Sequence, residues 1–461
     1  MLKKLTLRSN NLFEVEVKML PYWGHFLFII IVPFVVFQRN LSVFCNSKIG
    51  SIMQVSKSFR LHIGIFGKRN AGKSSVLNAL TSQEVSIVSE VAGTTTDPVE
   101  KPMELLPLGP VLFIDTAGID DTGALGAKRI RKTMQVFDRT DVGMIISTLA
   151  DWGDFEELIL KELKDRNIPV VVVLNKSDIG FSNDFLKQKF AAEKIVFVET
   201  SALTGAGIQY LRQAILKIAP DDFINRPGIV SDLVPPGEAA ILVVPIDKEA
   251  PKGRLILPQV QTIRDLLDND SFCMVVKERE LREAFTRLNK PPKLVVTDSQ
   301  AFLKVAADTP TEIPLTSFSI LFARYQGDLP EMVKGAMAID KLKTGDKVLI
   351  AEACSHHPIG EDIGTVKIPR WLTQYVGGRL EFVHHRGHDF PENLSEFKLI
   401  IHCGACMWNR REMLSRLMKA RLVNVPLTNY GLTIAYSLGI FERALQPFPA
   451  VLEIYRNNHN N

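Results

Sequence analysis

Residues 67–74 read Gly-Lys-Arg-Asn-Ala-Gly-Lys-Ser, and this stretch decides the fold of the first half of the chain. The apolar run 61–66 before it predicts a buried strand, and the apolar spacing of residues 75–80 behind it predicts a helix. A glycine-rich loop between a strand and a helix is the context of a P-loop, whose backbone N–H groups and helix N-terminus face phosphates. In this interpretation Lys73 brings a positive charge to the β and γ phosphates, and Ser74 binds Mg²⁺.

Three more motifs follow the loop in order, each where a predicted strand ends or a polar loop begins. A polar loop holds Thr95, whose hydroxyl is placed to reach Mg²⁺. The next apolar run delivers Asp115, which supports the metal through water, and Gly118, whose N–H senses the γ-phosphate. The run 169–174 ends in Asn175-Lys176-Ser177-Asp178. Each motif is weak alone, but their order at strand ends predicts a doubly wound nucleotide-binding domain.

The last of these residues, Asp178, identifies the base. Its carboxylate accepts two hydrogen bonds from the N1 and N2 groups of guanine, whereas adenine would leave it unpaired at a cost of a few kcal/mol. The predicted nucleotide is therefore GTP. The predicted catalytic residues are Lys73, Thr95 and Gly118, and the predicted nucleotide-binding set is Gly67, Asn70, Ala71, Gly72, Lys73, Ser74, Ser75, Asp115, Asn175, Lys176, Asp178, Ser201 and Ala202.

The charge balance and the cysteine count limit the classes of function. The 461 residues carry a formal net charge of +4. Residues 1–56 account for it with six Lys or Arg against two Glu, which leaves 49 charges of each sign in the rest of the chain. Equal numbers of positive and negative side chains in residues 57–461 argue against a large nucleic-acid-binding surface. Five cysteines are too few for a disulfide framework, so we expect a reducing cytoplasm.

Residues 1–56 do not match the rest of the chain. Basic residues precede an apolar run from Phe26 to Phe37, which resembles the core of a signal peptide or a short membrane segment. Export would separate a nucleotide-binding domain from its nucleotide. We therefore interpret 1–56 as an extension that is disordered or lies upstream of the native start, with Met53 as the initiator, and we expect no membrane association.

Alternating strand and helix patterns divide the remainder into three α/β domains. Residues 57–222 form the predicted nucleotide-binding domain. A linker at 220–237, rich in Pro, Asp and Gly, leads to a small α/β domain at 238–314, which has no catalytic grouping and is assigned to dimerisation. Residues 315–461 form a third α/β domain with a second candidate site.

That second site is predicted where two strands of the third domain end. The apolar run 348–351 leads to Cys354 and His356, and the run 397–401 leads to His402-Cys403-Gly404-Ala405-Cys406. In a parallel sheet, both loops lie beyond the carboxyl ends of their strands, where α/β domains bind ligands. Three thiols and two histidines there suit zinc or an iron–sulfur cluster.

Three interpretations compete for these residues. A metal-free polar cluster is disfavoured by five potential ligands at two strand ends. Structural zinc held by three cysteines and a histidine is the serious rival. The third interpretation is an iron–sulfur cluster bound by the three cysteines with a weaker fourth ligand, and spacing does not choose among His356, His402 and Glu361.

The nucleotide motifs resemble those of the TrmE and Era group of GTPases over residues 61–218. Asn70 sits where potassium-activated members of that group carry an asparagine, so the resemblance implies stimulation by K⁺. Ile119 stands where Ras-like enzymes have a water-orienting glutamine, and an isoleucine side chain cannot orient water. We therefore expect slow intrinsic hydrolysis.

The two sites together resemble the HydF family of FeFe-hydrogenase maturation GTPases over residues 57–455. The metal pattern is Cys354-x-His356, 45 residues, and His402-Cys403-x-x-Cys406, downstream of a GTPase domain and a small middle domain. The resemblance implies a 4Fe-4S cluster on Cys354, Cys403 and Cys406. It also implies a scaffold that receives a diiron precursor from radical-SAM maturases and passes the two-iron unit to apo-FeFe-hydrogenase. We expect this scaffold to be cytoplasmic and homodimeric.

Two other functions are compatible with parts of the sequence. An RNA-modification or ribosome-assembly GTPase with structural zinc would bind RNA in a strongly salt-dependent way, which the balanced charge disfavours. A redox enzyme that uses the cluster for electron transfer would need a flavin motif or a second cluster motif, and the sequence shows neither.

Overall fold

The computed structural model divides the chain into two compact units, Met1–Val55 and Ser56–Asn461. The residues it describes are 5–8, 14–22, 25–31, 56–81, 98–116, 133–148, 150–179, 184–224, 227–245, 255–353 and 362–459. None of the described helices is both long and apolar enough to span a membrane.

The first unit contains a small antiparallel sheet in the order β1 (Leu5–Arg8), β2 (Glu14–Tyr22) and β3 (His25–Ile31). These strands differ from the disorder suggested by the sequence. Apolar and polar residues alternate from Glu14 to Met19, which is the two-residue period of a strand. The apolar run that begins at Phe26 enters β3, and the proposed initiator Met53 lies outside the described residues.

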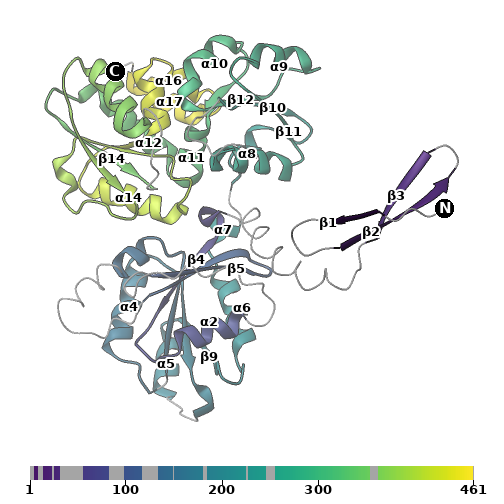
Figure 1. The fold of residues 1–461 in the computed structure, drawn as a ribbon. Coiled ribbons are helices and arrows are strands. Elements are labelled where there is room, and N and C mark those ends of the chain that lie inside the picture. Colours follow the sequence, from purple (N-terminus) through teal and green to yellow (C-terminus); the bar gives the residue numbers. More distant parts are fainter. Residues whose placement is uncertain are drawn as a thin grey trace. The chain divides into compact units, whose positions relative to one another are not determined.

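The second unit begins with a six-stranded sheet in the order β5-β6-β4-β7-β8-β9, with β5 antiparallel to β6 and the other neighbours parallel. Its strands are β4 (Leu61–Phe66), β5 (Val99–Leu105), β6 (Gly109–Asp115), β7 (Val142–Thr148), β8 (Val170–Asn175) and β9 (Val196–Glu199). Its helices are α2 (Lys73–Thr81), residues 133–138, α4 (Asp154–Asp165), α5 (Asp184–Ala192), α6 (Ile208–Ile218) and α7 (Asp221–Ile224). The predicted doubly wound fold of this domain is confirmed (Figure 1).

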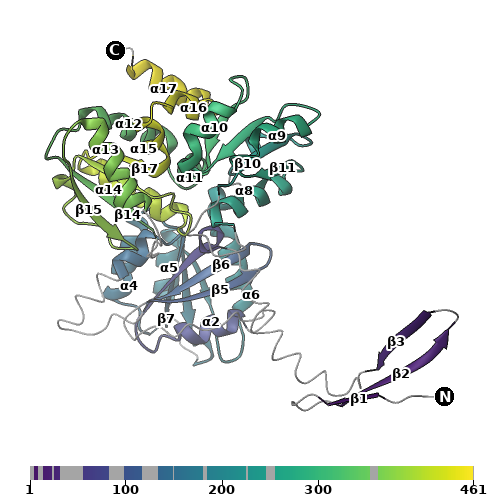
Figure 2. The same cartoon turned by 45° about the horizontal axis from the view of Figure 1, so that its top comes forward.

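Helices cover both faces of this sheet, α2 and α6 on one face and α4 and α5 on the other (Figure 2). Ile63 and Ile65 of β4 pack into the core with α2 and α6, whereas Leu112 and Ile114 of β6 pack into the core with α4 and α5. With both faces buried, the carboxyl ends of the parallel strands are the edge available to a ligand.

A second, all-parallel sheet follows in the order β11-β10-β12-β13. Its strands are β10 (Ala239–Val243), β11 (Phe272–Val276), β12 (Leu294–Thr297) and β13 (Leu315–Ser317), with helices α8 (Leu257–Asp268), α9 (Leu281–Arg287) and α10 (Phe302–Asp308). The predicted boundary at residues 314 and 315 needs correction, because β13 pairs with β12 and so belongs to the middle sheet.

The predicted linker also needs correction, because its second half is part of the fold. Ile229, Val230 and Val234 are buried in the core of the middle sheet. The Asp265 carboxylate of α8 accepts hydrogen bonds from the N–H groups of Val230 and Ser231, both at 2.8 Å. The sequence did not predict these buried apolar residues, because the Pro and Gly content of the segment is typical of a linker.

The third sheet is also all-parallel, in the order β15-β14-β16-β17. Its strands are β14 (Lys347–Glu352), β15 (Glu381–Arg386), β16 (Leu399–His402) and β17 (Leu427–Asn429). The helices around it are α11 (Phe318–Gln326), α12 (Leu329–Met337), α13 (Ile368–Val376), α14 (Arg410–Leu422), α15 (Tyr430–Ser437), α16 (Phe441–Leu445) and α17 (Pro449–His459). One continuous apolar core contains residues of both the middle and the third sheet.

Candidate functional site

The loop between β4 and α2 has the geometry of a phosphate cradle. Gly67 has a φ of 149° and Gly72 a φ of 93°. A Cβ atom at Gly67 would lie 2.1 Å from the carbonyl oxygen of Ile146, so no other residue fits there. The Lys73 ammonium donates hydrogen bonds to the carbonyl oxygens of Gly67 at 2.7 Å and Lys68 at 2.9 Å. This lysine therefore spans the loop that is to hold the phosphates.

Polar side chains stand at the open side of this loop. Ser74 and Ser75 in the first turn of α2 are exposed, and so is Asn70, whose φ of 64° is a left-handed conformation that asparagine tolerates. The N–H groups in the first turn of a helix have no partner within the helix and attract anions. Hydroxyl, amide and backbone N–H groups thus meet where the phosphates would bind.

Asp115, the last residue of β6, has the surroundings of a carboxylate that supports a metal. Its Oδ1 atom is buried and has no hydrogen-bond partner. Burial raises the pKa of Asp115, while the ammonium groups of Lys73 and Lys101 act in the opposite direction. A buried carboxylate oxygen without a partner is unfavourable unless a cation or its water completes it. Asp115 and Ser74 therefore fit a Mg²⁺ ion.

Asn175 links the phosphate end of the site to the base end. Its Nδ2 donates to the carbonyl oxygen of Ala71 at 3.1 Å, and its Oδ1 accepts from the Ala202 N–H at 3.2 Å. The residue is 3% exposed. In this structure the side chain of this predicted nucleotide-binding residue ties the two loops together. No pattern in the motif indicates the partner at Ala71.

The carboxylate of Asp178 remains open to a base. Asp178 and Lys176 are exposed, and Lys176 has a φ of 62° that turns the chain after β8. Ser201 is buried, and its Oγ accepts a hydrogen bond from the N–H of Thr204 at 3.2 Å, which shapes the adjacent loop. Two further predicted residues, Thr95 and Gly118, lie outside the described residues.

The second candidate site begins where β14 and β16 end. These strands are parallel neighbours, with Ala351 paired to His402, so the expectation that they end at one sheet edge is confirmed. Cys403 and Cys406 follow β16 and are half-buried. In the part of the chain that the structure describes, no three potential ligands form a metal-binding group. The other predicted ligands lie outside that part, namely Cys354, His356 and Glu361.

The surroundings of Cys403 suit a sulfur that ligates a metal. The N–H of Ala353 donates to Cys403 Sγ at 3.1 Å, and the N–H of Cys403 donates to the carbonyl oxygen of Ala351 at 2.9 Å. Ala405 has a φ of 52°, which tightens the turn between the two cysteines. N–H donors to sulfur stabilise a thiolate and a cluster bound to it. This pair of thiols fits an iron–sulfur or zinc centre that residues after Ala353 would complete.

His402 is buried beside this pair, with both ring nitrogens engaged. Arg416 donates from Nη1 to His402 Nε2 at 3.2 Å, so Nδ1 carries the proton and donates to the carbonyl oxygen of Cys403 at 2.9 Å. Burial and Arg416 lower the pKa of His402 to about 3, which keeps the ring neutral. In this conformation neither nitrogen offers a lone pair to a metal. His402 therefore supports the loop that carries Cys403.

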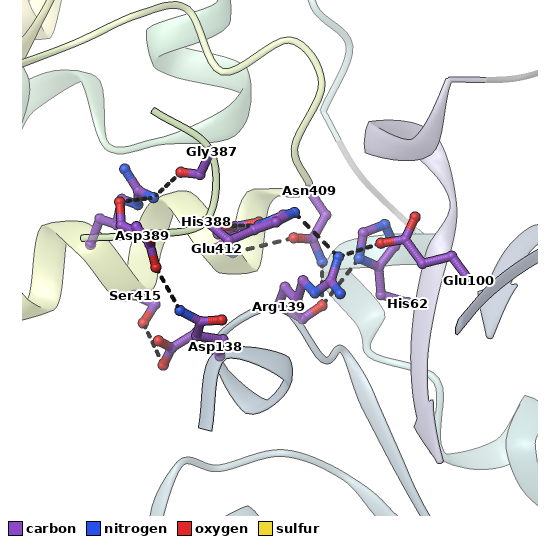
Figure 3. A network of polar contacts seen from close by, with 12 residues as sticks. His62, Glu100, Asp138, Arg139, Gly387, His388, Asp389, Asn409, Glu412 and Ser415 are labelled. Carbon is purple, nitrogen blue, oxygen red and sulfur yellow. Dashed lines mark hydrogen bonds and ion pairs between the residues drawn. The ribbon is translucent and has the colours of Figure 1, made fainter. Parts of the chain in front are cut away.

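A polar network joins the nucleotide-binding domain to the segment after the second cysteine (Figure 3). Asn409 caps the N-terminus of α14, and its Nδ2 donates to the carbonyl oxygen of Arg139 and to the Asp141 carboxylate, both at 3.0 Å. Asp138 accepts from the Ser415 hydroxyl at 3.1 Å. These partners lie about 270 positions apart in the chain. Sequence reasoning missed them because a single sequence carries no signal for such distant pairs.

Arg139 connects this network to β5. Its guanidinium donates to the Glu100 carboxylate and lies 3.4 Å from Nε2 of His388. The other nitrogen of His388 lies 2.7 Å from the Glu412 carboxylate on α14. His388 thus lies at this interdomain contact.

The ion pairs of Glu100 make the stability contributed by this network depend on pH. Burial would raise the pKa of Glu100, but Arg139 and Lys57 outweigh burial and hold the pKa at about 2. A depressed acid pKa stabilises the folded state above the unfolded pKa of about 4.5, and the stabilisation is lost as pH falls toward 2. We expect Glu100→Gln to lose on the order of 2 kcal/mol of stability at pH 7 and roughly half of that or less at pH 3.

Calorimetric melting of both proteins at the two pH values measures this difference. Glu104→Gln, an exposed change on the same strand, is the matched control. An equal loss at pH 7 and pH 3 would contradict the assignment of the ion pair.

Family models match most of the second unit. Residues 229–327 match the Hydrogen maturase F dimerization domain, and residues 330–447 match the Hydrogen maturase F tetramerization domain. Residues 62–176 match the 50S ribosome-binding GTPase model. The three models follow one another without overlap.

Two curated relatives each resemble about a third of the chain. GTPase Der of Wolinella succinogenes is 37% identical over 169 residues, which cover 34% of this chain and 36% of that protein. The tRNA modification GTPase MnmE of Endomicrobium trichonymphae is 37% identical over 179 residues, 37% of each chain. The chain thus spans about a third of the length of these relatives.

Solved structures resemble part of the chain. A variant of Era from Aquifex aeolicus, bound to GDP.AlF4-, is 24% identical, covers 50% of this chain and 98% of its own, and has a TM-score of 0.30. The G domain of the T. maritima FeoB iron transporter is 20% identical, covers 35% and 99%, and has a TM-score of 0.28.

Proposed function

This chain belongs to the hydrogen maturase F (HydF) family of GTPases, and from that membership we propose that it hydrolyses GTP in the maturation of an FeFe-hydrogenase. The observation that carries the proposal is the combination on one chain of a P-loop domain with two domains specific to that family. The matched dimerization and tetramerization domains support a homo-oligomer.

In the proposed hydrolysis, the residues of the first site bind and orient the nucleotide. Lys73 neutralises the β and γ phosphates, and Asp178 selects guanine. Ser74 and Asp115 would hold Mg²⁺, which supplies charge stabilisation at the transferred phosphoryl group. With Ile119 in place of a glutamine, this chain provides no side chain there to orient water. Turnover is therefore proposed to be slow and to depend on an added cation.

We assign this cation to K⁺, with Asn70 as the side chain that helps to hold it. The support is an exposed amide on the phosphate loop, together with the resemblance to potassium-activated GTPases. We expect Asn70→Ala to hydrolyse GTP in KCl no faster than in NaCl of equal ionic strength. The wild-type protein should be faster in KCl. Equal stimulation of both proteins by K⁺ would contradict the assignment.

For the second site, we propose a 4Fe-4S cluster on Cys354, Cys403 and Cys406. Three protein thiolates leave one iron with a replaceable ligand, which is what a carrier of metal cargo requires. The cargo would be a two-iron unit made by radical-SAM maturases and delivered to apo-hydrogenase in the cytoplasm. The hydrogen bond from Ala353 to Cys403 Sγ and the shared sheet edge of β14 and β16 support this assignment.

Anaerobic reconstitution with iron and sulfide tests the cluster. We expect about four irons per chain and an EPR signal after reduction, and loss of both in Cys403→Ala and Cys406→Ala. Cys273→Ala is the matched control, because Cys273 lies in β11 of the middle sheet. Stoichiometric zinc with no iron signal would instead favour an RNA-linked GTPase with a structural zinc site.

A further inference from the structure

Arg416 on α14 is a buried cation that contacts both sides of the Cys403 and Cys406 loop. It is 3% exposed. Its Nη1 donates to His402 Nε2 at 3.2 Å, and its Nη2 donates to the carbonyl oxygens of Gly387 at 2.8 Å and Asp389 at 3.3 Å. The guanidinium thereby holds the residue before the first cysteine against the loop after β15.

Aromatic rings enclose the same guanidinium. Its central carbon lies 4.1 Å from the ring centroid of Trp408 and 4.5 Å from that of Phe390. The Trp408 ring also meets the His402 ring edge to face, with centroids 5.1 Å apart. Because His402 precedes Cys403 and Trp408 follows Cys406, Arg416 fixes both ends of the segment that carries the two thiols.

The hydrogen bonds of Arg416 all go to neutral acceptors. Within the described ranges, no ion pair joins Arg416 to a carboxylate, although Glu412 on the same helix attracts it from a distance. Burial lowers the pKa of Arg416 to about 10, so the group remains a cation at neutral pH. A buried charge without a paired opposite charge is strongly unfavourable. The Cys403 sulfur attracts the guanidinium as well, together with the more distant carboxylates of Asp138 and Asp389.

We propose that Arg416 is a positioning residue whose charge is balanced by an anionic metal–thiolate centre on Cys403 and Cys406, and that it raises the reduction potential of the cluster bound there. The inference rests on the proposed iron–sulfur function. A nearby cation stabilises the form of the cluster that carries one more negative charge. The same cation orders the loop before the metal binds.

An EPR-monitored redox titration of the reconstituted full-length protein tests this role. Dithionite, acting through mediators, supplies one electron to each cluster. We expect Arg416→Gln to have a more negative midpoint potential. At a fixed potential the ratio of reduced to oxidised cluster should be tenfold lower, which corresponds to a shift of about 59 mV for one electron. Arg416→Lys keeps the charge but loses the planar fork, so its midpoint should stay nearer the wild type.

Arg421→Gln is the matched control, since Arg421 is exposed on the same helix five residues away. GTP hydrolysis and melting of each variant report whether the fold is intact. If the wild-type protein forms the cluster and Arg416→Gln has the same midpoint potential, this inference alone is overturned. A wild-type protein that forms no iron–sulfur cluster would overturn the proposed function and this inference together. If Arg416→Gln does not fold, Arg416→Met replaces it as the variant without the charge. Equal midpoint potentials in Arg416→Lys and Arg416→Met would then exclude a role of the charge.

Discussion

Asp178→Asn is expected to weaken GTP binding by on the order of 10²- to 10³-fold and to create binding of a xanthine nucleotide. The Asp178 carboxylate is exposed at the end of β8 and offers two acceptor oxygens. An asparagine replaces one acceptor with an N–H donor, which would face the exocyclic amine of guanine. Xanthine carries a carbonyl oxygen at that position, so it can accept from the new amide.

Fluorescent GTP and XTP analogues measure the two affinities. The xanthine nucleotide is an internal control, because a variant that had merely unfolded would bind neither. Equal GTP affinity in the wild type and the variant would exclude Asp178 as the group that selects the base.

Lys73→Ala is expected to lower GTP hydrolysis by on the order of 10²- to 10³-fold. The ammonium of Lys73 bonds to two carbonyl oxygens of the phosphate loop, and its charge opposes the rise that burial causes in the pKa of Asp115. Its removal deletes the charge that meets the phosphates and the contact that shapes the loop. Hydrolysis should therefore fall further than nucleotide binding.

Phosphate release under saturating GTP measures the rate, and nucleotide titration measures binding. Lys161→Ala is the control, because Lys161 is an exposed residue of α4 outside the nucleotide site. A rate within a few-fold of the wild type would contradict the P-loop assignment of Lys73.

The sequence predicted the parts of both sites that depend on local order along the chain. Glycines at Gly67 and Gly72, an acid at Asp115 and a pair of cysteines after a strand are readable because each stands at a fixed offset from a strand end. The parallel arrangement of β14 and β16 followed from the alternation of strands and helices.

The sequence did not predict the contacts that cross the fold. Asn175 reaches Ala71, Asn409 reaches Asp141, and no spacing rule relates either pair. Arg416 reads in the sequence as one more basic residue on a helix rich in arginine, and only its burial reveals an unusual charge. These features depend on which surfaces meet in three dimensions, and that information is spread over the whole chain.

The apolar core that runs under both the middle and the third sheet affects how the protein can come apart. The nucleotide-binding domain has two apolar cores of its own. The middle and third sheets share one core, so separating the chain between residues 327 and 330 would expose apolar surface on both fragments. The two segments named for dimerization and tetramerization should thus melt in one cooperative step. When either segment binds another subunit, we expect both segments to move together as one body.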